Sequence, residues 1–169
     1  MNQLKYCPQC GKENLQWDNE KKWNCSHCKF VLYHNCAAAV AVLITFEDEI
    51  LLTRRNQDPA KQKLDLPGGF TDPKESAEET CARELKEELN ITIDINKLTF
   101  LMSLPNVYPY KGIYYNTLDM IFTYPVEEKF DVEIEKSEIS EVVWLKKEAL
   151  KLEDIAFDSQ RKFFEKFLS

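Results

Sequence analysis

GGFTDPKESAEETCARELKEELNI, residues 68–91, decides the fold of the main body of this chain. Ser76 with Glu79 three residues later is a capping box, and Asn90 tolerates the left-handed conformation that ends helices. A helix is therefore predicted over 77–89. At about 100° per residue, one arc of this helix is acidic and the adjacent arc is small or apolar. The acidic arc holds Glu84, Glu87 and Glu88, and the adjacent arc holds Cys81, Ala82, Leu85 and Leu89. The apolar arc is expected to pack on a sheet, with the acidic arc beside it.

Two interpretations of the acidic arc stay open on the helix alone. Glu84 and Glu88 form an i, i+4 pair of like charges, which costs a few tenths of a kcal/mol when nothing lies between them. Arg83 stands four residues before Glu87 and could hold its carboxylate. The arc is either a solvated acidic face or a site for a hard cation such as Mg²⁺ or Mn²⁺, which prefers oxygen ligands.

The residues around the helix resemble the signature of the Nudix hydrolases, G-x5-E-x7-R-E-U-x-E-E-x-G-U, where U is aliphatic. The matching residues are Gly69, Glu75, Arg83, Glu84, Leu85, Glu87, Glu88 and Ile91. Asn90 replaces the final Gly, and the turn is expected to survive because Asn readily adopts the same backbone conformation. The resemblance covers roughly residues 37–150. It implies an α/β fold, an α/β/α sandwich around a mixed sheet.

The resemblance also implies a chemistry, the hydrolysis of a diphosphate with two or three Mg²⁺ or Mn²⁺ ions per site. The implied metal ligands are Glu75, Glu84, Glu87, Glu88 and the backbone of Gly69, with Glu84, Glu87 and Arg83 in catalytic roles. Such ions neutralise the bridging oxygens and lower the pKa of a bound water. Arg83 would orient a glutamate.

The general base has to come from a residue other than histidine. Both histidines, His27 and His34, precede residue 37, which excludes Ser-His-Asp and Cys-His catalysis in the main body. Glu138 resembles a downstream acid that some Nudix members use, and Glu141 is the runner-up. For both residues, an ordinary loop charge remains the alternative.

The first 36 residues contain two C-x-x-C pairs, CPQC and CSHC, separated by fourteen residues. This spacing predicts a zinc ribbon with the ligands Cys7, Cys10, Cys25 and Cys28. So short a segment needs structural Zn²⁺ for its folding energy. Its net charge of +2 is cancelled by zinc with four thiolates, which favours a clamp or dimerisation element over a nucleic-acid-binding role.

The composition changes after Cys36, where the domain boundary is expected, with a zinc ribbon over 1–36 and a Nudix domain over 37–169. AAAVAVLITF is an uninterrupted apolar run, as in a buried strand, and ILLTRR returns as a second strand. Further strands are predicted at about 91–103, 113–124 and 141–145, and a closing amphipathic helix from about 158 to 168.

The stretch SLPNVYPYKG, residues 103–112, bears on the substrate. A zinc ribbon followed by a Nudix domain resembles the NADH pyrophosphatase family, whose members carry S-Q-P-W-P-F-P here. Ser103, Pro105, Tyr108 and Pro109 fit this motif, whereas Leu104, Asn106 and Val107 depart from it. The candidate substrate-binding residues are Arg54, Arg55, Phe70, Tyr108 and Tyr110, as phosphate contacts or stacking planes.

Together these features predict a hydrolase that cleaves a nucleoside diphosphate linked to another moiety, with NADH, NAD⁺ or ADP-ribose as the leading substrates. We expect a cytoplasmic homodimer that has no membrane segment and, at a net charge of −7, no general nucleic-acid surface. A nucleotide-sensing module without catalysis is the alternative, although such modules tend to lose box glutamates. A hydrolase of modified nucleoside triphosphates or capped RNA ends is a third interpretation.

Overall fold

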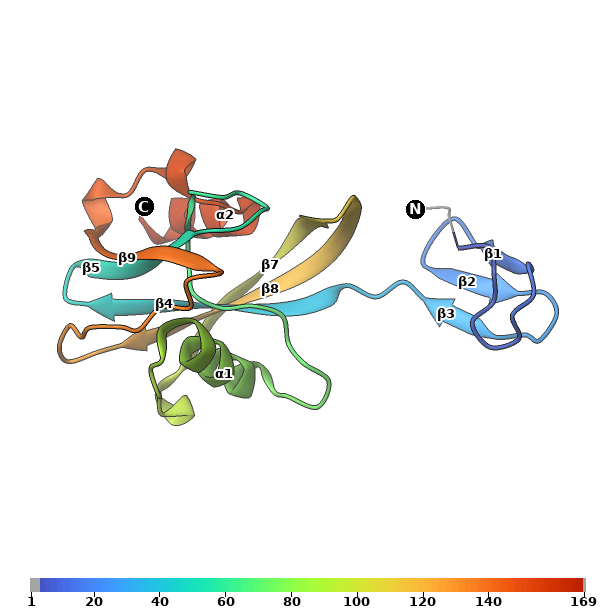
Figure 1. Ribbon diagram of the computed structural model, residues 1–169, viewed down its shortest axis with the longest axis horizontal. Helices are drawn as coiled ribbons and strands as arrows, with labels where there is room; N and C mark the ends of the chain where they lie inside the picture. Colours follow the sequence, from blue (N-terminus) through green and yellow to red (C-terminus); the bar gives the residue numbers. More distant parts are fainter. Residues whose placement is uncertain (1–3, 169) are drawn as a thin grey trace. The chain divides into compact units, whose positions relative to one another are not determined.

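The computed structural model describes residues 4–168 and divides the chain into two compact units, Met1–Cys36 and Ala37–Ser169 (Figure 1). Each unit has its own sheet and core, so each is described by itself. Among the described residues, no helix is both long enough and apolar enough to cross a membrane.

The first unit is a small antiparallel sheet with strand order β1-β2-β3. Its strands are β1 (Leu15–Trp17), β2 (Lys22–Cys25) and β3 (Val31–Tyr33). Two cysteines, Cys7 and Cys25, are buried together with Leu15 and Trp23, and the rings of Trp17 and Trp23 lie 4.5 Å apart. The buried core of this unit is small, and the cysteine side chains are part of it.

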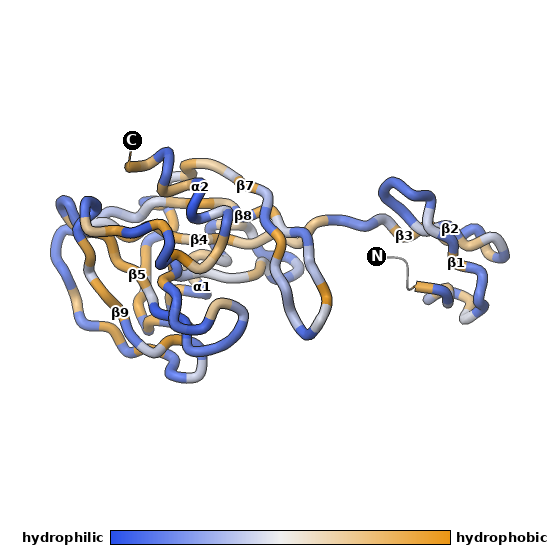
Figure 2. Tube along the Cα trace, turned by 90° about the horizontal axis from the view of Figure 1, so that it is seen from above, coloured by the Kyte–Doolittle hydropathy of each residue, from blue (hydrophilic) through white to orange (hydrophobic). Residues whose placement is uncertain are grey.

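The second unit is built on a mixed sheet, as predicted, and this sheet has six strands. Its strands are β4 (Ala37–Phe46), β5 (Glu49–Arg55), β6 (Leu64–Asp65), β7 (Thr99–Tyr110), β8 (Ile113–Pro125) and β9 (Ile139–Lys146). The order is β6-β5-β4-β8-β7, with β9 on the other edge of β5. Strands β4 and β8 run parallel and the other pairs are antiparallel. In Figure 2 the hydrophobic colour follows β4, β5 and β9.

Two helices cover opposite faces of this sheet, which confirms the predicted sandwich (Figure 1). Helix α1 (Ala77–Leu89) packs on the face that carries Val40 and Val42, and α2 (Asp158–Phe167) packs on the face that carries Ala41 and Leu43. The alternation of side chains along a strand explains this division, and burial on both faces explains why β4 reads as an uninterrupted apolar run. Three 3₁₀ turns complete the unit: Ile95–Lys97, Lys147–Ala149 and Leu152–Asp154.

The strand predicted at about 91–103 is present but its bounds are wrong, because the ladder begins only at Thr99 and continues to Tyr110. Ile91 and Ile93 instead pack as partly buried side chains on the α1 cluster, so their apolar alternation serves packing without strand pairing. Strand β7 contains two prolines, Pro105 and Pro109, which are tolerated because β7 ends the strand order and needs hydrogen bonds on one side only.

The loop after β6 runs along the free part of β4. Strands β4 and β5 pair only near their connecting turn, from Ile44 to Phe46 on β4. Beyond that point the Val42 N–H donates to the Pro67 carbonyl and the Val40 N–H to the Gly69 carbonyl, each at 2.8 Å. The glycine loop is therefore fixed to the central strand of the sheet, next to α1.

Candidate active site

Helix α1 is fixed at both ends by its own sequence. The Ser76 hydroxyl accepts from the Glu79 N–H at 3.1 Å, and the Glu79 carboxylate accepts from the Ser76 N–H at 2.8 Å, so the predicted capping box is present. Asn90 has φ 55° and ψ 27°, the predicted left-handed end. The residues that anchor the helix to the sheet are fully buried: Cys81, Leu85 and Leu89. The neighbouring acidic arc is thereby turned toward the glycine loop.

Glu88 lies deepest among the glutamates of α1. Its Oε2 accepts a hydrogen bond from the Gly68 N–H at 3.0 Å. Burial raises the pKa of Glu88 well above its usual range, and the negative charges of Asp65, Glu84 and Glu138 add to the rise. No Lys, Arg or His nitrogen within residues 4–168 comes within ion-pair distance of it. Even a partly buried carboxylate without a cation is costly, which makes this a position that a metal ion would stabilise.

Arg83 holds the remaining box glutamates. Its bonds, between 2.8 and 3.1 Å, reach the carboxylates of Glu75, Glu84 and Glu87 and the carbonyl of Phe70. The sequence analysis named only Glu87 as a carboxylate that Arg83 could hold. Because one guanidinium faces three carboxylates, it sets their positions without neutralising them.

The environments of these glutamates differ. The hydrogen bond from Arg83 lowers the pKa of Glu75, whereas burial raises the pKa of Glu84 despite the same partner. The Glu87 side chain is 60% exposed. The acidic arc thus runs from a buried to a solvent-facing carboxylate, so ligands of different basicity are available on one helix.

The acidic arc forms one wall of a cleft of about 610 Å³. Carboxylates on this side are Glu84, Glu87, Glu88, Glu135 and Glu138. Aromatic side chains line it too: Phe70, Tyr108 and Phe157. The Tyr108 ring centroid lies 5.3 Å from that of Phe70 and 5.6 Å from that of Phe157. One cavity therefore offers both a cation-binding surface and apolar ring surfaces.

Glu138 lines this cleft from a distant part of the chain, in the loop before β9. The Glu135 N–H donates to the Glu88 carbonyl at 3.0 Å, and the Glu138 carbonyl accepts from the Asn56 N–H at 2.6 Å. Glu141 does not line the cleft; its carboxylate pairs with Arg54 at 2.8 Å. Of the two candidate bases, the structure brings only Glu138 to the box glutamates.

The two arginines at the end of β5 are separated. Arg54 is held outside the cleft by Glu141 and by the Gln62 carbonyl at 3.0 Å. Arg55 lines the cleft, but its side chain is bound to Asp65 at 2.8 Å and to the Pro59 carbonyl at 2.7 Å. Its guanidinium carbon lies 4.9 Å from the centre of the Phe157 ring. Arg55 therefore builds the wall of the cleft.

Tyr110 lies outside the acidic cleft. It lines an adjoining apolar pocket of about 400 Å³, together with Ala37, Tyr115 and the two shared residues Phe70 and Tyr108. The predicted aromatic residues are thus divided between two neighbouring cavities.

Several cleft residues escaped the sequence analysis: Asp65, Asn106, Thr117, Asp119, Phe157 and Gln160. Asp65 and Asp119 could have been noticed, because each is an acid inside an apolar strand segment, LDL and LDM. Gln160 carries no such signal; it lies on the closing helix and donates to Asp65 at 2.6 Å.

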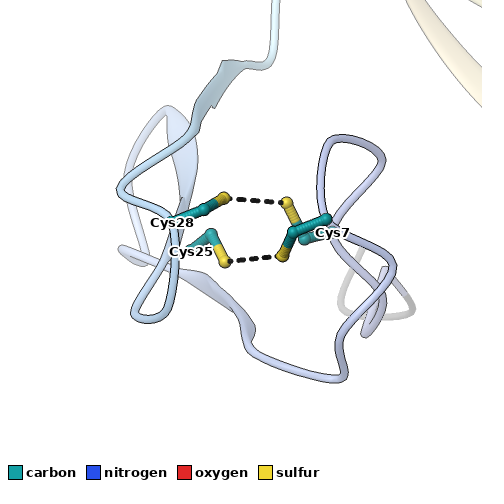
Figure 3. A group of neighbouring side chains, drawn as sticks. Cys7, Cys25 and Cys28 are labelled. Carbon is teal, nitrogen blue, oxygen red and sulfur yellow. Dashed lines mark hydrogen bonds between the residues drawn. The ribbon is translucent and has the colours of Figure 1, made fainter.

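Four of the five cysteines of the first unit converge, as the spacing predicts: Cys7, Cys10, Cys25 and Cys28 (Figure 3). Cys7 Sγ lies 3.6 Å from Cys28 Sγ, and Cys10 Sγ lies 3.8 Å from Cys25 Sγ. A tetrahedron with Zn–S bonds of about 2.3 Å has sulfur–sulfur edges of roughly 3.8 Å. The geometry therefore fits a tetrahedral thiolate site.

Among residues 4–168, this cysteine group alone has all its donor atoms within 4.8 Å of one another. The carboxylates of Glu75, Glu84 and Glu87 bind Arg83, and that of Glu88 binds the Gly68 N–H. Their fit to a metal ion rests on their carboxylate oxygens, which hard cations prefer, and on Glu88, which has no ion-pair partner among residues 4–168.

Comparison with known proteins bears on this site. The chain matches the NUDIX domain family over residues 34–167. It is 36% identical over 89 residues to a NAD-capped RNA hydrolase NudC of Pseudomonas fluorescens, an alignment that covers 53% of this chain and 32% of the relative. It is 37% identical over 78 residues to an ADP-ribose pyrophosphatase of Methanocaldococcus jannaschii, covering 46% of each chain. The chain spans less than half the length of these curated relatives.

Solved structures agree on the fold. The chain resembles the NUDIX hydrolase of Nitrosomonas europaea with a TM-score of 0.65 and 24% identity, over 96% of this chain and 92% of the other. The NUDIX domain of Shewanella oneidensis NrtR, solved with ADP ribose, gives a TM-score of 0.63 and 22% identity over 80% and 88% of the two chains.

Proposed function

Because this chain belongs to the NUDIX domain family, we propose that it is a divalent-metal-dependent hydrolase that cleaves the diphosphate of a nucleoside diphosphate linked to another moiety. NADH or NAD⁺ and ADP-ribose are the leading substrates, and a nucleoside monophosphate is one product. The names of two relatives support this choice, since NAD-capped RNA and ADP-ribose share an ADP unit joined to ribose.

The observation that carries the proposal is the composition of the cleft beside α1. Glutamates on α1 suit cations that would bind a diphosphate, and Phe70 and Tyr108 in the same cavity suit the ring system of a nucleoside. A solvated acidic face would have no reason to adjoin such aromatic rings.

Each box residue then has a role. Glu84, Glu87 and Glu88 hold Mg²⁺ or Mn²⁺, with Glu75 and the Gly69 backbone supporting them. When bound, such ions neutralise the diphosphate oxygens and lower the pKa of the attacking water. Arg83 keeps the glutamates in position, as its hydrogen bonds to three of them indicate. Glu138 accepts the proton of the water as general base.

For the substrate, we retain Phe70, Tyr108 and Arg55, which line the cleft, and leave out Arg54 and Tyr110, which do not. Residues 1–36 form the ribbon, which Zn²⁺ at the four cysteines stabilises, and residues 37–169 form the catalytic domain. We further expect a homodimer, which sedimentation velocity tests.

Incubation with Mg²⁺ or Mn²⁺ and a panel of dinucleotides, nucleotide sugars and triphosphates tests the function, with products resolved by chromatography. Glu87→Gln should abolish most turnover. Glu79→Gln is the matched control, because it removes the same charge from the same helix outside the cleft and glutamine also completes a capping box. No turnover of any compound would favour a nucleotide-sensing module, and equal turnover in both variants would contradict the role given to Glu87.

A further inference from the structure

Asp119 on β8 is a carboxylate of the cleft for which the proposed reaction has no role. Its Oδ1 accepts from the Thr117 hydroxyl at 2.6 Å, and its Oδ2 accepts from the Asn106 amide at 2.9 Å and the Ser159 hydroxyl at 2.6 Å. These donors come from β8, β7 and the first turn of α2. Asp119 is therefore held rigidly from three elements.

All three donors are neutral. Within residues 4–168, no Lys, Arg or His nitrogen comes within ion-pair distance of Asp119, whereas nearby Asp65 pairs with Arg55 at 2.8 Å. An ionised carboxylate has about four acceptor positions, and three are used here. The remaining position is on Oδ1, and Asp119 lines the cleft.

Asp119 also lies close to the acidic wall. Burial raises the pKa of Asp65, and the charge of Asp119 adds to that rise, while Asp65 in turn acts on Glu88. A negative charge at this place repels a phosphate and accepts hydrogen bonds only. The ribose of a nucleotide fits this place, because it adjoins the phosphates, carries no charge and donates hydrogen bonds.

On the basis of the proposed function, we propose that Asp119 is a specificity-determining residue that accepts a hydrogen bond from a ribose hydroxyl of the substrate. The same carboxylate then rejects a ribose that carries a phosphate at that hydroxyl. The substrate class is accordingly a nucleotide with a free ribose diol, as opposed to one phosphorylated on the 2′ or 3′ position.

The test is calorimetric titration of the full chain, in Mg²⁺, with AMP, adenosine 2′,5′-bisphosphate and adenosine 3′,5′-bisphosphate. None of these contains a diphosphate, so binding is read independently of cleavage, and failure of the proposed hydrolysis is recognised separately by turnover of ADP-ribose. The wild type should bind at least one bisphosphate about tenfold or more weakly than AMP. The isomer that is rejected identifies the hydroxyl.

Asp119→Asn, which keeps the size and one acceptor, should reduce this ratio to within about threefold. Ser159→Ala is the control: it removes a partner of Asp119 but leaves the charge, so the ratio should persist. If Asp119→Asn does not fold, Asp119→Ser replaces it. The proposal is overturned if AMP does not bind, if the wild type binds all three ligands alike, if the ratio persists without the carboxylate, or if Ser159→Ala loses it equally.

Discussion

Replacing Gly68 by alanine tests the link between the glycine loop and the acidic helix. Gly68 has φ +144°, and a Cβ there would overlap the Val40 carbonyl oxygen and lie 2.9 Å from its carbon. These atoms are backbone of the buried central strand and cannot rotate away. The loop must therefore retreat from β4, taking with it the N–H that holds Glu88.

The expected cost follows from what the retreat breaks. Holding alanine in such a backbone conformation costs about 1–3 kcal/mol. The hydrogen bonds from Val40 to Gly69 and from Val42 to Pro67 are both weakened, at about 0.5–1.5 kcal/mol each. Gly68→Ala should thus lower the free energy of unfolding by about 2–6 kcal/mol, measured by urea denaturation followed by far-UV circular dichroism. Turnover should fall by roughly 10²-fold, because a displacement of about 1 Å in an active site can cost that much in rate.

Gly112→Ala is the matched control. Gly112 also has a positive φ, +79°, but nothing lies within 4 Å of the position its Cβ would take. The cost there should be only about 1 kcal/mol, with turnover unchanged. Equal destabilisation by the two substitutions, or full turnover in Gly68→Ala, would refute the reasoning, since the close approach to β4 would then be irrelevant.

Three further predictions concern other parts of the chain. Arg83→Ala should lower kcat by about 10²-fold or more in a Mg²⁺-dependent assay, since three carboxylates lose their shared donor, and Arg83→Lys should restore little because an ammonium lacks the planar fork. Elemental analysis should find about one zinc per chain in the wild type and none in Cys25→Ser, while the far-UV signal of the second unit should keep its own melting transition. A hydrogen bond from Lys162 lowers the pKa of Asp158 in the folded protein below its ordinary value of 3.8. The ionised Asp158 therefore stabilises the fold fully above pH 3.8, and this stabilisation is lost as the pH falls through the folded-state pKa. Asp158→Asn should slightly flatten the acid limb of a curve of unfolding free energy against pH.

The features predicted from sequence depend on residues that are close along the chain. The caps of α1 and its apolar arc involve neighbours within four residues, so their spacing is visible in the sequence and survives in the structure. The cysteine pairs belong to the same class, because each C-x-x-C turn brings its two thiols to one site. The apolar alternation before Thr99 fits either a paired strand or a loop that packs on the core, and the strand prediction failed there.

The rest of the site was decided by tertiary structure. Arg54 and Arg55 are equivalent in sequence, but consecutive side chains of a strand point to opposite faces, and the register with β9 shifts between them, so one meets Glu141 and the other meets Asp65. Asp119 enters the cleft because β8 pairs in parallel with the distant β4 and α2 packs against it. Local sequence therefore determined which side chains the helix carries. Long-range pairing determined which other residues share its cavity, because sheet register and helix docking depend on contacts between residues far apart in the chain.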